Sequence, residues 1–407
     1  MATPVDELSL PKLDFFLGTN REDRRKVLRT TAKQSWLAQT DIGYTVLTYE
    51  TIMGVLRDKR WHSATGLGAQ LQGITNPEYL NRRRRVSILN AEGDVHVRLR
   101  RLVAPAFSPR SADRLRPFMR DVVNELVDPL SAKGSGEIVQ ELCEPYPIPI
   151  ICELLGAPKE DWQSFSKWAT DVLRIFSENL ANELDVIMKA QDEINAYTRN
   201  LIEQRRSEPR EDLLTDLIAA EEEGDRLTSE ELEMMVEAVI IGGTDTTRNQ
   251  LGLALVLFAN NPEQWSILRE RPELAPRAVE EVMRYHGAVG GTIRFASEDI
   301  EYNGVLFPKG TFMSTSMGTG NFDESVFPQP DLFDITREPV GQPQLSFGAG
   351  IHYCLGASLA RAELQEAFIT LSQRMPNLAL NGTVEYKPTG VGIFGPASLP
   401  VTFTKGL

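Results

Sequence analysis

The chain has 407 residues, 42% of them hydrophobic, and a formal net charge of −14 at pH 7. The negative charge argues against nucleic acid as a partner, because phosphate binding requires a basic surface. No apolar run approaches the length of a membrane span, and the N-terminus lacks the basic and apolar regions of a secretory signal. Three cysteines, Cys143, Cys152 and Cys354, form an odd and sparse set that favours a reducing compartment over a disulfide framework. We therefore expect a soluble, cytoplasmic enzyme.

Helical periodicity dominates the centre of the chain. We predict helices over residues 96–107, 112–132, 146–154, 160–179, 183–206, 211–221, 228–260, 262–270, 273–286 and 356–374. Short strand-like runs lie toward the ends, at Tyr44–Thr48, Ile300–Leu306, Thr311–Ser316, Leu378–Tyr386 and Leu399–Thr404. No repeat or flexible linker marks a domain boundary. The prediction is a mainly α chain with a small β portion, folded as a single domain over residues 1–407.

The pattern over 228–260 is unusually long. Thr228 and Glu231 form a capping box at its start, and Asn261-Pro262 follows its end. Its middle reads GGTDTT (242–247), and the two glycines alone disfavour a helix by about 2 kcal/mol relative to alanine. Either one helix makes room for a group against its backbone, or two helices meet at the Gly-Gly pair.

One cysteine stands directly before a predicted helix, after a glycine-rich turn. Free N–H groups at the start of that helix would favour the thiolate of Cys354, which could then bind iron. Gly348, Gly350 and Gly356 would let the backbone approach a flat macrocycle, and Phe347 would cover the sulfur. Without these neighbours, a lone buried cysteine is usually a small hydrophobic residue.

The segment FGAGIHYCLG (347–356) resembles the haem-binding signature F-x-x-G-x-x-x-C-x-G of the cytochrome P450 family. The resemblance runs from about Thr45 to the C-terminus and is weakest over residues 1–40 and 61–92. It implies the P450 fold of the soluble bacterial type, a single domain around a buried haem b (iron protoporphyrin IX). Cys354 would be the iron ligand, with Phe347, Gly348 and Gly356 beside the cofactor.

Two further motifs of the family are present. Glu281 and Arg284 match its E-x-x-R pair, and Arg337 matches the arginine that joins the pair to clamp the cysteine loop, a structural role. Without the resemblance, a Glu–Arg pair at this spacing is usually a surface ion pair.

The GGTDTT segment matches the oxygen-binding groove [AG]-G-x-[DE]-T-T. It implies that Gly243 gives room beside the iron, and that Asp245 and Thr246 are catalytic and deliver the protons that dioxygen cleavage requires. The alternative is that Thr246 only bonds to a carbonyl one turn earlier.

A set of basic side chains matches the family's propionate ligands, namely His96, Arg100, Arg294 and His352. A buried anion needs such partners. An arginine-rich helix is otherwise usually solvated, and Arg98, Arg101 and Arg361 could then dock an acidic electron donor. The run Arg82–Arg85 is either a solvated loop or a site for a substrate carboxylate.

The family's pocket positions map to small and aliphatic residues, which favour a bulky apolar substrate such as a terpenoid, steroid, polyketide or fatty-acid-like molecule. These positions are Ala238, Ile241, Gly242, Thr246, Val289, Gly290, Thr292 and Ile393, with Phe394 as an additional candidate.

The resemblance implies a monooxygenase that uses O2. The chain shows no flavin motif or iron–sulfur cysteine set, so electrons would come from a separate ferredoxin and its NAD(P)H-dependent reductase. The alternatives are a peroxide-driven or non-oxygenating haem-thiolate enzyme, which would not need the Asp245–Thr246 pair, and a haem-binding sensor or carrier without turnover.

Overall fold

Helices account for most of the chain. The computed structural model describes residues 2–14, 21–65, 67, 69, 72–177, 179–222, 227–387 and 393–405. Its α-helices are α1 (Arg21–Ala32), α2 (Tyr49–Arg57), α4 (Pro77–Arg83), α5 (Gly93–Val103), α6 (Pro109–Lys133), α7 (Pro147–Leu155), α8 (Trp162–Val172), α9 (Leu184–Ser207), α10 (Leu213–Glu222), α11 (Ser229–Asn260), α12 (Pro262–Glu270), α13 (Ala275–His286), α14 (Met317–Gly320) and α15 (Ala357–Arg374). Within the described ranges, none of these helices has the length and hydrophobicity to cross a membrane.

The central helix α11 is continuous through its glycine pair. The predicted capping box is present: Thr228 Oγ1 accepts from the Glu231 N–H at 3.2 Å, and the Glu231 side chain accepts from the Thr228 N–H at 2.9 Å. From Thr244 to Phe258 nearly every side chain is buried, as expected for a helix surrounded by others. This excludes the alternative of two helices that meet at Gly242-Gly243.

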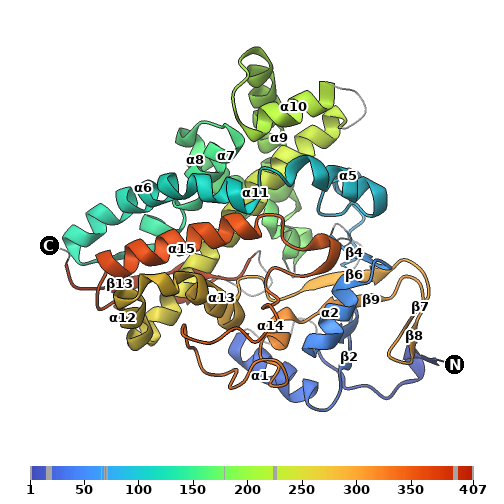
Figure 1. Cartoon of the computed structure of the whole chain (residues 1–407). Helices are drawn as coiled ribbons and strands as arrows, with labels where there is room; N and C mark the ends of the chain where they lie inside the picture. Colours follow the sequence, from blue (N-terminus) through green and yellow to red (C-terminus); the bar gives the residue numbers. More distant parts are fainter. Residues whose placement is uncertain are drawn as a thin grey trace.

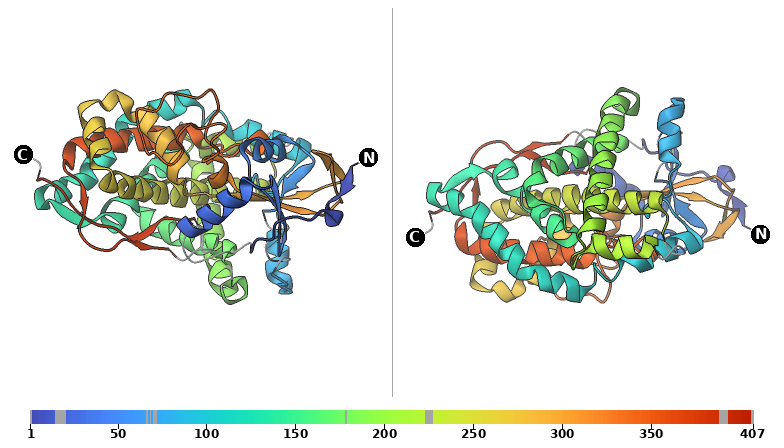
Figure 2. Two further views of the ribbon diagram at one scale, coloured as in Figure 1. Left: turned by 90° about the horizontal axis from the view of Figure 1, so that it is seen from below. Right: turned by 90° about the horizontal axis from the view of Figure 1, so that it is seen from above.

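The main hydrophobic core lies where α6, α7, α11, α13 and α15 meet. In Figure 1, α15 (red) lies alongside α6 (teal), and these two helices have the most extensive contact in the fold. Figure 2 shows α11 in the middle of the helical part from two further directions. Its neighbours include α7, α8 and α9.

The strands form four small sheets toward the N-terminal side of the molecule and near the C-terminus (Figure 1). They are β1 (Thr3–Pro4), β2 (Leu37–Thr40), β3 (Gly43–Val46), β4 (Trp61–Ser63), β5 (Ser135–Glu137), β6 (Thr292–Ala296), β7 (Ile300–Tyr302), β8 (Val305–Phe307), β9 (Phe312–Thr315), β10 (Ala379–Leu380), β11 (Glu385–Tyr386), β12 (Pro396–Ser398) and β13 (Pro400–Thr402). The largest sheet has the order β2-β3-β9-β6-β4, and Arg294 on β6 lies opposite Ser63 on β4. A second hydrophobic core covers this sheet.

The predicted mainly α class is confirmed, with several corrections to the elements. The run Leu378–Tyr386 is not one strand: β10 pairs with β13 and β11 pairs with β12, in different sheets. The predicted helix over 160–179 ends at Val172 and continues as a 3-10 turn. The helices α1, α2 and α4 and the strands β2, β4 and β6 were not predicted, because each is short or lies in a segment with weak periodicity.

Candidate active site

Cys354 lies in a tight loop that leads into α15. Its N–H donates to the Phe347 carbonyl at 2.9 Å, and α15 begins at Ala357. The Gly356 N–H and the charges of Arg100 and Arg361 lower the pKa of the Cys354 thiol, as the sequence suggested, but burial outweighs them and raises that pKa above its ordinary value. The protein surroundings alone therefore do not deprotonate the Cys354 thiol. Coordination to a metal ion would deprotonate it, because a coordinated thiol loses its proton.

The glycines of this loop differ in conformation and in the space around their α-carbons. Gly348 and Gly350 have φ of 69°, a left-handed conformation that favours glycine. A Cβ on Gly350 would collide with the Leu56 carbonyl oxygen at the end of α2, so Gly350 serves packing and not a macrocycle, contrary to the sequence interpretation. Gly348 has only the His352 carbonyl within 4 Å of such a Cβ, and Gly356 has no neighbour at that distance. These two glycines leave open space beside the cysteine.

Arg361 braces the outer side of the cysteine loop. Its guanidinium lies 4.4 Å from the centre of the Phe347 ring, bonds to Glu280 on α13 at 2.5 Å and donates to the Tyr353 hydroxyl at 3.0 Å. Glu280 and Tyr353 outweigh burial and raise the pKa of Arg361. Arg361 is therefore not a free cation for docking a donor; Arg98 is likewise bonded to Glu231, at 2.5 and 3.0 Å.

The four predicted propionate ligands gather beside the loop. The rings of His96 and His352 are 4.6 Å apart, and Arg100 donates to the carbonyls of Ile351 and Tyr353 at 3.3 and 2.7 Å. Arg294 is buried and its side chain donates only to Thr292 Oγ1 and its neighbour's carbonyl, so burial lowers its pKa.

This basic cluster contains unpaired groups. His96 Nε2 is buried without a hydrogen-bond partner in the described structure, and its pKa is lowered to about 4 by burial and by the charges of His352 and Arg100. Arg100 and Arg294 form no ion pair with a described carboxylate, whereas His352 Nε2 contacts Glu92 Oε1 at 2.9 Å. A buried guanidinium such as that of Arg294 requires an anionic partner, and the orphaned imidazole nitrogen of His96 requires a hydrogen-bond partner; a carboxylate can serve as both. The residues present thus fit a cofactor that carries carboxylates beside Cys354, as haem does.

The glycine pair of α11 faces two directions. Among the described residues, a Cβ on Gly242 would meet no atom within 4 Å, whereas one on Gly243 would collide with the Ile151 side chain on α7. The interpretation that Gly243 gives room beside the iron is therefore wrong; the open side belongs to Gly242. The Thr246 hydroxyl donates to the Gly242 carbonyl at 2.8 Å, as the alternative interpretation of this residue expected.

Asp245 is buried between two cations. Arg248 forms an ion pair with its carboxylate, and Lys387 Nζ lies 3.4 Å from Oδ1. Arg248 also donates to Ser166 Oγ at 2.9 Å and Thr170 Oγ1 at 2.7 Å, both on α8. The carboxylate is therefore held in a network that joins three parts of the chain. The sequence indicated neither cation as a partner.

The structure brings Glu281, Arg284 and Arg337 together. Both carboxylate oxygens of Glu281 accept from Arg284 at 2.8 Å, and Arg337 donates to Oε2 at 3.1 Å. Arg284 also donates to the Asn321 carbonyl at 3.1 Å, and the Asn321 side chain accepts from the Leu345 N–H at 2.7 Å. A chain of hydrogen bonds thus runs from α13 to the segment just before Phe347.

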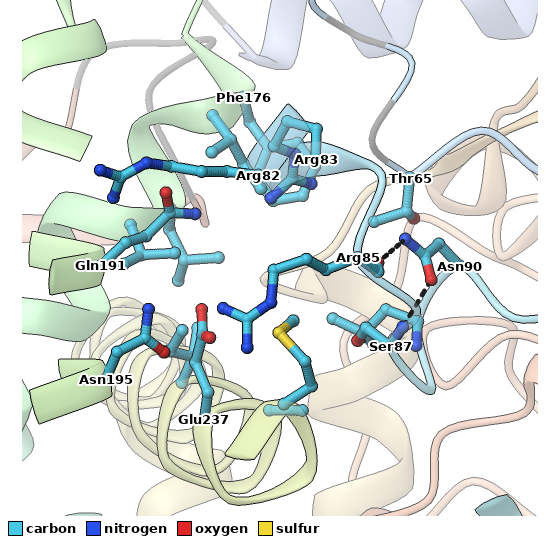
Figure 3. Close-up of a pocket in the computed structure, with 17 residues that line it drawn as sticks. Thr65, Arg82, Arg83, Arg85, Ser87, Asn90, Phe176, Gln191, Asn195 and Glu237 are labelled. Carbon is cyan, nitrogen blue, oxygen red and sulfur yellow. Dashed lines mark hydrogen bonds between the residues drawn. The ribbon is translucent and has the colours of Figure 1, made fainter. Parts of the chain in front are cut away.

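A cavity lies between α11, α9 and the segment that precedes α5 (Figure 3). Its lining residues are Thr65, Arg82, Arg83, Arg85, Ser87, Leu89, Asn90, Val172, Leu173, Ile175, Phe176, Gln191, Asn195, Met234, Glu237, Ala238 and Ile241. Of the predicted pocket positions, Ala238 and Ile241 line it. Arg82, Arg83 and Arg85 of the arginine run also line it, whereas Gln191, Asn195 and Glu237 were not predicted.

The other predicted pocket positions lie outside that lining. Val289 packs against the second core, and Ile393 against the main core. The Gly290 carbonyl accepts from the Gly318 N–H at 2.9 Å, and Thr292 Oγ1 accepts from Arg294. Phe394 stacks on the Tyr386 ring with centroids 5.4 Å apart.

Comparisons with known proteins agree with this arrangement. The family model for cytochrome P450 matches residues 70–376. The chain is 36% identical to nocardicin C N-oxygenase of Nocardia uniformis subsp. tsuyamanensis, over 88% of this chain and 89% of that protein. It is also 36% identical to luteothin monooxygenase of Streptomyces thioluteus, over 97% and 96% of the two chains. The crystal structure of CalO2 superimposes with a TM-score of 0.87 at 31% identity, over 96% of this chain and 98% of that one.

The class of protein is a haem-dependent oxidoreductase: the fold is mainly helical, a half-buried cysteine precedes α15, and Arg100 and Arg294 beside it have no described carboxylate partner. The chain belongs to the cytochrome P450 family. Its activity is that of a monooxygenase of this family.

Proposed function

We propose that the chain binds haem b through the Cys354 thiolate and inserts one atom of O2 into an organic substrate. Phe347, Gly348 and Gly356 would border the cofactor, and His96, Arg100, Arg294 and His352 would hold its propionates. The single observation that carries the cofactor assignment is the orphaned, buried His96 Nε2 among arginines without carboxylate partners. Thiolate-ligated haem supplies binding and cleavage of dioxygen.

Proton delivery falls to the chain's own residues. Thr246 Oγ1 lies on the open side of α11 near Gly242, and Asp245 is the adjacent carboxylate. Arg248 and Lys387 fix the position of the Asp245 carboxylate, and we propose that Asp245 passes protons to Thr246 Oγ1. An enzyme driven by peroxide would not need this relay.

The substrate would occupy the cavity beside Ala238 and Ile241. The neighbouring positions Gly242, Val289, Gly290, Thr292 and Ile393 were assigned to the pocket by resemblance; Gly242 retains support because its α-carbon faces open space. Relatives named nocardicin C N-oxygenase and luteothin monooxygenase support a substrate of secondary metabolism, and the lining by Ala238 and Ile241 supports a substrate with an apolar part. We propose a separate ferredoxin and an NAD(P)H-dependent reductase as electron donors.

The test is the absorbance of the reduced, carbon-monoxide-treated protein. We expect the maximum of thiolate-ligated haem, and its loss in Cys354→Ser. Product formation should depend on O2, NADPH, ferredoxin and reductase, and should exceed that with hydrogen peroxide. A Cys354→Ser variant with unchanged pigment and turnover would refute the haem ligand; faster turnover with peroxide would favour the peroxide-driven alternative.

A further inference from the structure

The wall of the cavity on α9 and α11 carries hydrogen-bond acceptors without donors. Glu237 is 6% exposed, and its carboxylate forms no hydrogen bond or ion pair with a described residue. Gln191 Oε1 and Asn195 Oδ1 are likewise buried without a partner. Gln191 and Asn195 are one helical turn apart, so both point from one face of α9 toward the cavity, as Figure 3 shows.

A buried carboxylate in such surroundings demands a counterion. Burial raises the pKa of Glu237, and the charges of Arg85 and Arg83 offset this only in part. An ionised carboxylate without a hydrogen-bonded partner is costly inside a protein. A ligand that brings a positive charge and a donor would remove that cost.

The arginines of the cavity do not supply the partner. Arg82 is bonded to Glu78 and Asp192, both at 2.6 Å, on the side away from Glu237. Arg85 is bonded to Glu230 at 2.8 Å and lies 3.5 Å from Glu233.

Arg83 forms no ion pair with the described residues, but it is half-exposed and water can solvate its charge. In Figure 3 it lies with Arg82 and Phe176 on the opposite side of the cavity from Glu237. Among the charged side chains that line the cavity, Glu237 is therefore the buried one that has no ion pair with a described residue.

The polar groups lie at a defined distance from the proposed reaction site. Glu237 precedes Thr246 by nine residues of α11, which is about 13 Å along the helix axis. Ala238 and Ile241 line the cavity between them and offer only apolar surface. The cavity is thus polar at one end and apolar toward Gly242.

From this arrangement we infer that the substrate is an elongated apolar molecule with a protonated amine at one end. The ammonium group donates to the Glu237 carboxylate, with Gln191 Oε1 and Asn195 Oδ1 within reach of its remaining hydrogens or of a neighbouring hydroxyl or amide. The oxidised carbon lies about 13 Å from the amine, because that is the axial distance from Glu237 to Thr246. The inference rests on the proposed function for its reaction, and on the described cavity for its ligand.

The experiment compares three probes with one alkyl chain and different ends: decylamine, decan-1-ol and decanoate. Binding to the haem-loaded protein at pH 7.4 is measured by equilibrium dialysis, and the spin state of the ferric haem is recorded in parallel. We expect the amine to bind at least tenfold more tightly than decanoate, without the spectrum of a nitrogen bonded to iron. Equal binding of the three probes, or tighter binding of decanoate, would overturn the inference.

Substitutions in the cavity wall test where the amine group of the probe binds. Glu237→Gln keeps the shape of the side chain and should weaken the amine about tenfold or more, as the loss of a charge-assisted hydrogen bond predicts, while decan-1-ol changes less than twofold. Gln191→Leu should weaken the amine by a smaller factor. The control is Glu203→Gln on α9, an exposed carboxylate that does not line the cavity.

An amine affinity that Glu237→Gln leaves unchanged contradicts the inference even if the amine is the preferred probe. The outcome is separate from that of the proposed function: a normal haem-thiolate spectrum without amine preference refutes only the inference, whereas an absent thiolate spectrum refutes the proposed function.

Discussion

Arg248 forms a buried ion pair with Asp245, three residues earlier on α11. Both side chains are 3% exposed, and Arg248 extends the contact to two hydroxyls on α8. The pair therefore ties the proposed proton donor to the helix that borders the cavity. A movement of α8 would therefore shift Arg248 and, through it, the Asp245 carboxylate.

Asp245→Asn tests the proton route. The amide keeps the shape but cannot carry a proton to Thr246, so we expect kcat to fall about 100-fold with haem content unchanged. The solvent deuterium isotope effect on kcat should rise, because proton delivery becomes limiting. The control is Asp216→Asn on α10, an exposed carboxylate. An unchanged isotope effect with full kcat would exclude Asp245 from the route.

The two glycines of α11 provide a matched pair. Gly243→Ala should lower the free energy of unfolding by about 1–3 kcal/mol, because the new methyl group collides with Ile151. Gly242→Ala should leave the fold intact or slightly more stable, because the methyl group enters open space and alanine favours the helix. Thermal unfolding of both variants measures the difference. Equal destabilisation would mean that the two faces of α11 are not as different as described.

Arg284→Lys tests the network on α13. Lysine keeps the charge but loses the planar fork that bonds both Glu281 oxygens, so we expect a loss of about 3 kcal/mol and weaker haem retention. Arg277→Lys, on the same helix, disturbs an exposed pair with Glu338 and a hydrogen bond of 3.4 Å to the Thr336 carbonyl, and should change stability by less than about 1 kcal/mol. Denaturant unfolding and haem loss to an acceptor protein measure both effects; similar values for the two variants would contradict the clamp.

Glu363 on α15 should make stability depend on pH. Burial raises its pKa to about 8, although the Thr247 hydroxyl donates to Oε2 at 3.1 Å and lowers it in part. The folded protein thus holds a proton that the unfolded chain releases near pH 4.5, so this contribution to stability is complete below that pH and is lost as pH rises toward 8. Glu363→Gln should be more stable than the parent at pH 8 by about 1–4 kcal/mol and differ little at pH 5. Unfolding at both pH values checks this; a difference that is larger at pH 5 would reverse the sign.

The cysteine loop and the Glu281 network were predictable because the residues that form them lie close together in short sequence segments. Cys354 stands with its glycines in ten consecutive residues, and Glu281 and Arg284 share one helix face. Arg337 could be assigned only by resemblance, since its contact spans 56 residues. The roles proposed for these residues remain predictions that the variants above address.

Only part of the cavity could be predicted, through Ala238, Ile241 and the arginine run, because most of its lining comes from segments that meet only in the folded chain. Glu237 lies within an apolar stretch of α11, and its charge at a buried helix position was the one signal available. Glu92 likewise precedes His96 by one turn and contacts His352, a contact over 260 residues that no local pattern reveals. Which of the two glycines of α11 faces open space could also not be predicted from the sequence, since it depends on the position of Ile151 on another helix.

Different segments of the chain build the two ends of the proposed active site. The residues around Cys354 are held by α13 and by the start of α15, whereas the cavity is built by α9 and the segments before α5 and after α8; α11 contributes to both. Side chains that share no partner contribute independently to free energy. Substitutions at Gln191 or Asn195 should therefore alter which molecules are accepted without altering the redox properties of the iron, so that selectivity can diverge while the reaction is preserved.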